Sequence, residues 1–151
     1  MNFLSPPQSP IETASAWFEH AKNTVATVNP LAMVLSTLQS GGTIASRTLL
    51  LKGFDENGVL FFTNYNSAKA NEIELHNEVA LLFHWDSLQR QIRIQGVATK
   101  IDSQESDSYF ATRARLSQIG AWASNQSQPL DNRESLLSKV QAFEEKWKGQ
   151  E

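Results

Sequence analysis

Apolar and polar residues change their spacing along the chain, and these changes predict the order of helices and strands. Ser9 and Pro10, a helix cap and a first-turn proline, precede apolar residues spaced three or four apart, which predicts a helix over 9–24. Shorter runs rich in branched and aromatic residues follow this helix. We expect them to form five strands, at 29–38, 43–51, 59–64, 79–85 and 90–101.

The links between these strands are short, which predicts that the strands run antiparallel. "QSGG" at 39–42 and "DSLQ" at 86–89 indicate turns, and Asn57-Gly58 is a strong signal for a hairpin. Parallel neighbours would need longer crossover connections.

Helices complete the predicted fold. A short helix is expected at about 68–77 and a helical C-terminal part at 103–148. The predicted fold class is α+β, an antiparallel barrel or sheet with strands at about 31–101 and helices at its periphery. The length of 151 residues suits a single domain, 1–151.

Composition narrows the function classes. A formal net charge of −3 argues against general affinity for nucleic acid. No stretch approaches the roughly 20 apolar residues of a membrane span, and the first residues lack a secretory pattern, so we expect no membrane partner and a cytoplasmic protein. Cysteine is absent, which excludes disulfides and thiolate chemistry. The histidines, His20, His76 and His84, lack ligand spacing, so no metal site is predicted.

One candidate site is the start of the helix in "NSAKANEIELHN". Ser67 is a plausible cap, which places Lys69 in the first helical turn. A cation is unfavourable there because the helix N-terminus is already positive. A bound anion would make the position favourable, because the lysine and the free N–H groups would both attract it. The alternative is a solvated lysine.

A helix is predicted at "SQESDSYFATRARL", and a second candidate site lies on this helix in the stretch "DSYFATRARLSQIG". Tyr109, Arg113 and Ser117 stand at i, i+4 and i+8, so a continuous helix would present a phenol, a guanidinium and a hydroxyl on one stripe. This donor set suits an oxyanion, although Tyr109 could simply pack.

Two strands supply the remaining candidates. In "SRTLLLKGFD", Arg47 and Lys52 are five positions apart, so an unbroken strand would point them to opposite faces. In "RQIRIQG", Gln91 lies on the polar face, either towards solvent or towards a polar ligand.

Three stretches together resemble the pyridoxamine 5′-phosphate oxidase family, also called pyridoxine phosphate oxidases. They are "SRTLLLKGFDENGVLFFTNYNSAKANEI", "VALLFHWDSLQRQIRIQGVA" and "YFATRARLSQIGAWASNQSQPL", and their order and spacing agree with the family over about 29–147. The resemblance implies the FMN-binding split β-barrel, a Greek-key antiparallel fold, and a homodimer with FMN at its interface.

The resemblance also implies roles for single residues. Arg47 and Lys69 would contact the FMN phosphate, and Gln126 and Ser127 would reach FMN from the other subunit. The residues that the resemblance implies as FMN contacts are Arg47, Thr48, Leu49, Leu50, Leu51, Lys52, Phe62, Thr63, Ser67, Lys69, Gln91, Gln126 and Ser127. The phosphate of a B6 vitamer would be held by Lys52, Tyr109, Arg113 and Ser117.

The implied reaction is the FMN-dependent oxidation of pyridoxamine or pyridoxine 5′-phosphate to pyridoxal 5′-phosphate. Oxygen reoxidises the flavin and gives hydrogen peroxide, and no side chain is assigned as a catalytic acid or base.

Two departures from the family pattern leave alternatives open. Ala68 stands where the family usually has an arginine, which predicts weaker FMN binding. The chain also stops before a family segment that carries a tryptophan and an Arg-x-His pair, as in a shortened chain or a natural short relative. The alternatives are an FMN oxidase of another substrate, of the phenazine-precursor type, and a flavin- or B6-phosphate-binding protein without turnover.

Overall fold

The structure is a computed structural model that describes residues 4–149, and the chain divides into two compact units. The sheet unit comprises the residues up to Phe62 together with Leu75–Ala98, and the helical unit comprises Thr63–Glu74 together with the residues from Thr99 onward. Within the described residues, no helix is both long and apolar enough to cross a bilayer.

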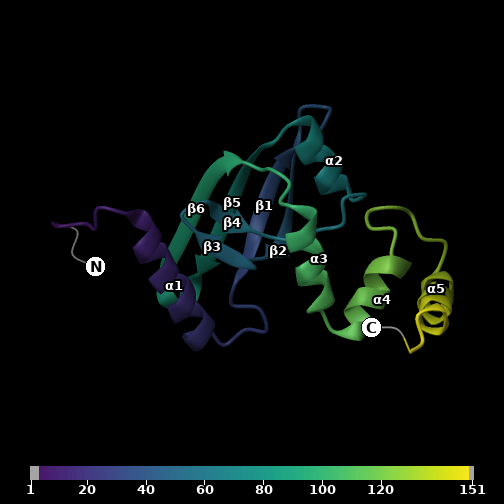
Figure 1. The fold of residues 1–151 in the computed structure, drawn as a ribbon. Coiled ribbons are helices and arrows are strands. Elements are labelled where there is room, and N and C mark those ends of the chain that lie inside the picture. Colours follow the sequence, from purple (N-terminus) through teal and green to yellow (C-terminus); the bar gives the residue numbers. More distant parts are fainter. Residues whose placement is uncertain (1–3, 150–151) are drawn as a thin grey trace. The chain divides into compact units, whose positions relative to one another are not determined.

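The sheet unit contains two antiparallel sheets (Figure 1). The larger sheet has the order β2-β1-β5-β6, and its strands are β1 (Ala32–Leu38), β2 (Ile44–Leu50), β5 (Glu78–Trp85) and β6 (Arg90–Val97). A hairpin forms the smaller sheet, from β3 (Gly53–Asp55) and β4 (Gly58–Leu60). A short 3-10 turn, η1 (Asp86–Leu88), joins β5 to β6.

Helix α1 (Pro10–Thr24) closes the core of the sheet unit. Ser9 caps it by accepting a hydrogen bond from the Ile11 N–H at 3.2 Å, as the sequence predicted. The Phe18 ring packs edge-on against three aromatic rings at centroid distances of 4.7–5.7 Å, those of Phe54, Phe83 and Trp85. These edge-on contacts join the helix to both sheets.

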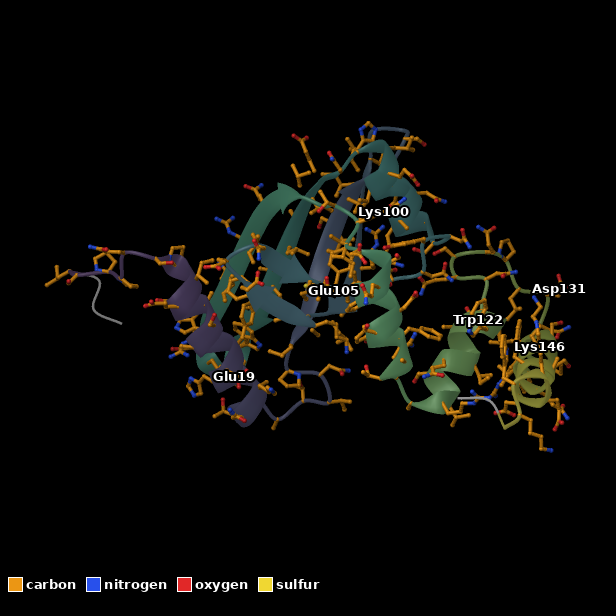
Figure 2. The ribbon with its side chains drawn as sticks, viewed as in Figure 1. Glu19, Lys100, Glu105, Trp122, Asp131 and Lys146 are labelled. Carbon is orange, nitrogen blue, oxygen red and sulfur yellow. The ribbon has the colours of Figure 1, made fainter. Side chains whose placement is uncertain are left out.

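The helical unit contains α2 (Ala68–Leu75), α3 (Ser103–Ala111), α4 (Arg115–Ala123) and α5 (Arg133–Lys146). Trp122 lies between α4 and α5 (Figure 2), with its ring 6.4 Å from that of Phe143 and 6.1 Å from that of Trp147. Lys100, labelled in the same view, pairs with Glu74 at 3.2 Å.

The antiparallel α+β prediction is confirmed, but a strand that was not predicted, β3, follows the second predicted strand. The Leu51 N–H still bonds the Leu31 carbonyl beside β1, whereas the Lys52 N–H bonds the Leu60 carbonyl in the hairpin. The chain therefore changes sheets between these residues, and the described part has six strands instead of five.

The hairpin itself forms where Asn57-Gly58 predicted it. Asp55 pairs with Gly58, so Glu56 and Asn57 form a two-residue loop. Gly58 has φ +125°, a conformation that glycine adopts without strain.

The single helix predicted through "SQESDSYFATRARL" is wrong, because α3 ends at Ala111 and α4 begins at Arg115. The Gln118 side-chain Nε2 lies 3.0–3.3 Å from the carbonyl oxygens of Phe110, Ala111 and Arg113. It therefore satisfies carbonyls that a continuous helix would have used internally.

Candidate functional site

Lys69 is the second residue of α2, and its side chain is buried among neutral oxygen atoms. Only 7% of the residue is exposed. Its Nζ donates to Gln126 Oε1 at 2.9 Å, to Ser67 Oγ at 3.1 Å and to Thr63 Oγ1 at 3.2 Å. An ammonium group has three donors, so each of these oxygens can take one.

The start of α2 adds a positive field to this charge. The Ser67 carbonyl accepts from the N–H groups of Ala70 and Asn71, which places Ser67 at the cap position as predicted. The N–H groups of the first turn point out of the helix, and the dipole makes this end positive. Glu72, three residues further along α2, is also buried, with 7% of the residue exposed. The arrangement can accept an anion at the helix start.

Gln126 reaches Lys69 within one chain. It lies in the segment between α4 and α5, and its Oε1 also lies 3.5 Å from Thr63 Oγ1. We expected Gln126 and Ser127 to serve FMN from the other subunit. The structure shows Gln126 bonded to Lys69 of its own chain, and the expected contact with FMN of the other subunit stays a prediction.

Arg47 lies on the more buried face of β2. Burial alternates along Ile44–Leu50, and its pairing with β1 has no break, so no bulge reverses the faces. The guanidinium Nη1 donates to the hydroxyl of Thr37, which is 1% exposed, and to the Ala45 carbonyl at 3.2 Å. These contacts fix the position of the guanidinium.

The residues after Arg47 continue the same alternation. Leu49 and Leu51 share its more buried face, whereas Thr48, Leu50 and Lys52 are exposed. Arg47 is therefore half-buried and Lys52 exposed, and that the two cations serve opposite sides stays a prediction. Lys52 itself lies beyond the end of β2, at the change from one sheet to the other.

The remaining flavin candidates lie on several elements. Phe62 and Thr63 are both half-buried and follow β4. Gln91 lies on the exposed face of β6 and pairs with His84, whereas Ile92 and Ile94 are more buried. Ser127 has φ +66°, a left-handed conformation unusual for a residue with a side chain.

The proposed donor set for the substrate phosphate spans two helices and their connection. Tyr109 is on α3, Arg113 is in the link, and Ser117 is in the first turn of α4. They do not form one helical stripe. The Arg113 guanidinium lies 5.7 Å from the centre of the Phe110 ring, a cation–π contact that orients it. The N-cap of α4 is Ala114, which makes no side-chain hydrogen bond to the first turn of the helix.

Sequence reasoning missed two residues that support these groups, Thr37 and Gln118. Thr37 and Gln118 act through contacts between strands or between helices, and local sequence carries no sign of them. Within residues 4–149, no group of three or more acidic or histidine side chains is placed to hold a metal ion.

Two solved structures share the fold of this chain. PhzG from Burkholderia lata 383, solved in complex with tetrahydrophenazine-1-carboxylic acid, matches with a TM-score of 0.85 and 29% identity over 92% of this chain and 68% of that one. A pyridoxamine 5′-phosphate oxidase-related, FMN-binding protein from Nostoc punctiforme PCC 73102 matches with a TM-score of 0.67 at 20% identity, over 87% of this chain and 73% of that one. The fold is the FMN-binding split β-barrel.

Sequence comparison gives the family. The family model for pyridoxamine 5′-phosphate oxidase matches residues 20–147. The pyridoxine/pyridoxamine 5′-phosphate oxidase of Rubrobacter xylanophilus is 48% identical over 93% of this chain and 64% of its own length. That of Psychromonas ingrahamii is 45% identical over 98% of this chain and 68% of its own. The chain belongs to the pyridoxamine 5′-phosphate oxidase family, and it spans about two thirds of the length of these relatives.

Proposed function

We propose that the protein is an FMN-dependent oxidase of vitamin B6 metabolism that converts pyridoxamine or pyridoxine 5′-phosphate to pyridoxal 5′-phosphate. The observation that carries this proposal is the identity of 45–48% to relatives that bear the name of this activity. The phosphate-suited groups described above support it. A cytoplasmic location stays a prediction.

The residues at the start of α2 fit the phosphate of FMN. They combine a buried ammonium, two hydroxyls and a helix N-terminus, which together match a dianion with several acceptor oxygens. Lys69, Ser67 and Thr63 would hold this phosphate, with Arg47 as a second cation. Thr48, Leu49, Leu50, Leu51, Lys52, Phe62, Gln91, Gln126 and Ser127 remain proposed flavin contacts. Ala68 supplies no side-chain donor, so the backbone and Lys69 would carry more of the binding.

A second phosphate, that of the substrate, would be held by Lys52, Tyr109, Arg113 and Ser117. Arg113 is already oriented by Phe110, and Ser117 lies at a helix start whose cap makes no side-chain bond. Both features favour the binding of an oxyanion.

FMN, when bound, supplies the hydride-accepting chemistry. The side chains position the substrate, and none is assigned as an acid or base. In the net reaction of the amine, two electrons pass from its C4′ carbon to oxygen, giving hydrogen peroxide. Water supplies the aldehyde oxygen, and ammonia leaves.

A homodimer with FMN at its interface is part of this proposal. Several large apolar side chains of the helical unit are exposed, and a second copy of the chain would remove them from water: Leu116, Trp122, Leu130 and Leu137.

The test is to incubate the purified protein with FMN and pyridoxamine 5′-phosphate in air, and to measure pyridoxal 5′-phosphate and hydrogen peroxide. Equal amounts of aldehyde and peroxide are expected. Binding of both ligands without either product would instead indicate a flavin- or B6-phosphate-binding protein without turnover.

A second candidate function is the oxidation of a phenazine precursor. The TM-score of 0.85 to PhzG favours it. The same assay with a dihydrophenazine carboxylate in place of pyridoxamine 5′-phosphate distinguishes the two candidate functions. This substrate has no phosphate, so the proposed phosphate donors would not contribute to its binding. Faster peroxide release with the phenazine substrate would favour this candidate.

A further inference from the structure

The helical unit contains a pocket of about 510 Å³ between α3, α4 and the end of α5. Three of its walls are aromatic: the ring of Trp122 lies 6.4 Å from that of Phe110 and 6.1 Å from that of Trp147. Ile119, which is 1% exposed, adds an aliphatic wall. Sites for small molecules typically measure about 300–1,000 Å³ and combine apolar walls with a few polar groups. The pocket has this size and these walls.

The pocket lies on a different face of the two helices from the proposed substrate-phosphate donors. Tyr109 and Ser117 are each two positions away from lining residues of their own helix, a rotation of about 200° around the helix axis. The lining residues themselves are spaced three or four apart, as on one helical face: Asp107, Phe110 and Ala111 on α3, and Arg115, Ile119 and Trp122 on α4. The pocket is therefore separate from the substrate-phosphate set.

The lining includes a buried donor that has no partner in the protein. Among residues 4–149, the indole Nε1 of Trp147 is the one buried side-chain polar atom without a hydrogen bond. A buried donor left unpaired costs free energy, and an acceptor that reaches it recovers this cost. Since Trp147 lines the pocket, an oxygen atom of a bound ligand is a suitable acceptor.

Two exposed lining residues carry charges of opposite sign. The Arg115 guanidinium donates to the backbone carbonyl of Trp147, which keeps this cation beside the residue with the unpaired indole N–H. A carboxylate suits these two side chains, because both are donors. Asp107 only accepts when ionised, so it suits an ammonium group. The lining therefore matches a ligand that carries both charges together with an aromatic body.

We propose that this pocket binds a free aromatic α-amino acid. The ring of the ligand lies against the aromatic walls, its carboxylate accepts from Trp147 Nε1 and Arg115, and its ammonium group pairs with Asp107. This site uses none of the residues proposed for FMN or for the B6 phosphate, so the inference stands apart from the proposed function.

The indole signals of ¹⁵N-labelled, FMN-loaded protein test the contact at Trp147, with unlabelled L-phenylalanine as the probe. The chain has four tryptophans, and the signal that disappears in Trp147→Phe identifies Trp147. This signal should move on addition of L-phenylalanine, because the indole N–H gains an acceptor. A Trp147 signal that stays in place at saturating L-phenylalanine would overturn the inference.

Two analogues of the probe separate the roles of its charges. Phenylethylamine lacks the carboxylate and should bind about tenfold more weakly, as expected for the loss of a hydrogen bond to a charged group. Phenylpropanoate lacks the ammonium group and should bind about threefold more weakly, because Asp107 is exposed and exposed ion pairs act weakly. Affinity for either analogue equal to that for L-phenylalanine would overturn the amino-acid assignment.

Asp107→Asn tests the ammonium contact without changing the apolar walls. This variant should bind L-phenylalanine and phenylpropanoate equally, since the partner of the ammonium group has lost its charge. Asp131→Asn is the matched control, because Asp131 is an exposed aspartate of the same unit that does not line the pocket (Figure 2). The control should keep the preference for L-phenylalanine. A preference that survives in Asp107→Asn, or that is lost in both variants, would contradict the role of Asp107.

Discussion

At the scale of single residues, Lys69 is a buried cation at the positive end of a helix, a position that is unfavourable for the isolated chain. Its ammonium donates to three neutral oxygens, those of Thr63, Ser67 and Gln126. Hydrogen bonds offset part of the cost of burial, and an arriving dianion would add a favourable interaction with the same charge. This is why we place the cofactor phosphate here.

Removing this charge should weaken FMN binding selectively. Lys69→Met keeps the length of the side chain but loses the charge, so FMN affinity should fall at least about tenfold, as expected for one charge-assisted hydrogen bond. Fluorescence titration measures this loss. Lys100→Met, an exposed lysine of the same unit paired with Glu74, is the control and should bind FMN normally. Equal losses in the two variants would contradict a specific role for Lys69.

The two cations near β2 should be separable by mutation. Arg47→Ala should weaken FMN binding by about ten- to a hundredfold, at roughly 1.4 kcal/mol per tenfold. Lys52→Ala should weaken FMN binding less than Arg47→Ala does and lower the affinity for pyridoxal 5′-phosphate by about ten- to a hundredfold, because Lys52 is exposed and lies beyond the strand that carries Arg47. Titrating each variant with both ligands tests this. Loss of FMN in Lys52→Ala with B6-phosphate binding unchanged would refute the assignment.

At the scale of elements, the break between α3 and α4 decides where the substrate-phosphate donors lie. The link between the two helices begins with Thr112 and Arg113, and neither is a glycine or a proline, the residues that would have predicted a break. The cause is Gln118, which reaches back from α4 to the last carbonyls of α3. The hairpin at Asn57-Gly58 was predictable because its signal is local. The bonds of the Gln118 side chain to carbonyls at the end of α3 depend instead on how α3 and α4 pack together.

Proline substitutions test the break. Ala114 has φ −53° and ψ 139°, values that proline adopts, so Ala114→Pro should leave stability unchanged or raise it by about 0.4–1 kcal/mol. Urea unfolding measures the change. Ser108→Pro, inside α3, is the comparison and should cost about 3 kcal/mol. A similar loss in Ala114→Pro would mean that one continuous helix runs through this position.

At the scale of the whole molecule, the fold class and the family could be predicted from the sequence, because three motifs in the order and spacing of the family span most of the chain. The contact between Gln126 and Lys69 was not, since 57 residues separate them and neither shows a local sign of the other. The sequence predicted both residues as flavin contacts, which stays a prediction, and the structure adds that they meet within one chain.

A dimer with FMN at its interface should lose flavin when its subunits separate. Dilution should therefore release FMN together with a fall in mass, because binding and assembly are linked. Light scattering and flavin fluorescence on the same samples measure both. A monomer that still binds one FMN tightly would contradict the shared site.

The central claim is that the chain recognises its flavin by the phosphate, and parallel titrations with FMN and riboflavin test it most directly. Fluorescence quenching should show that FMN binds at least about tenfold more tightly, because only FMN offers a dianion to Lys69 and Arg47. Equal affinities for the two flavins would contradict the account.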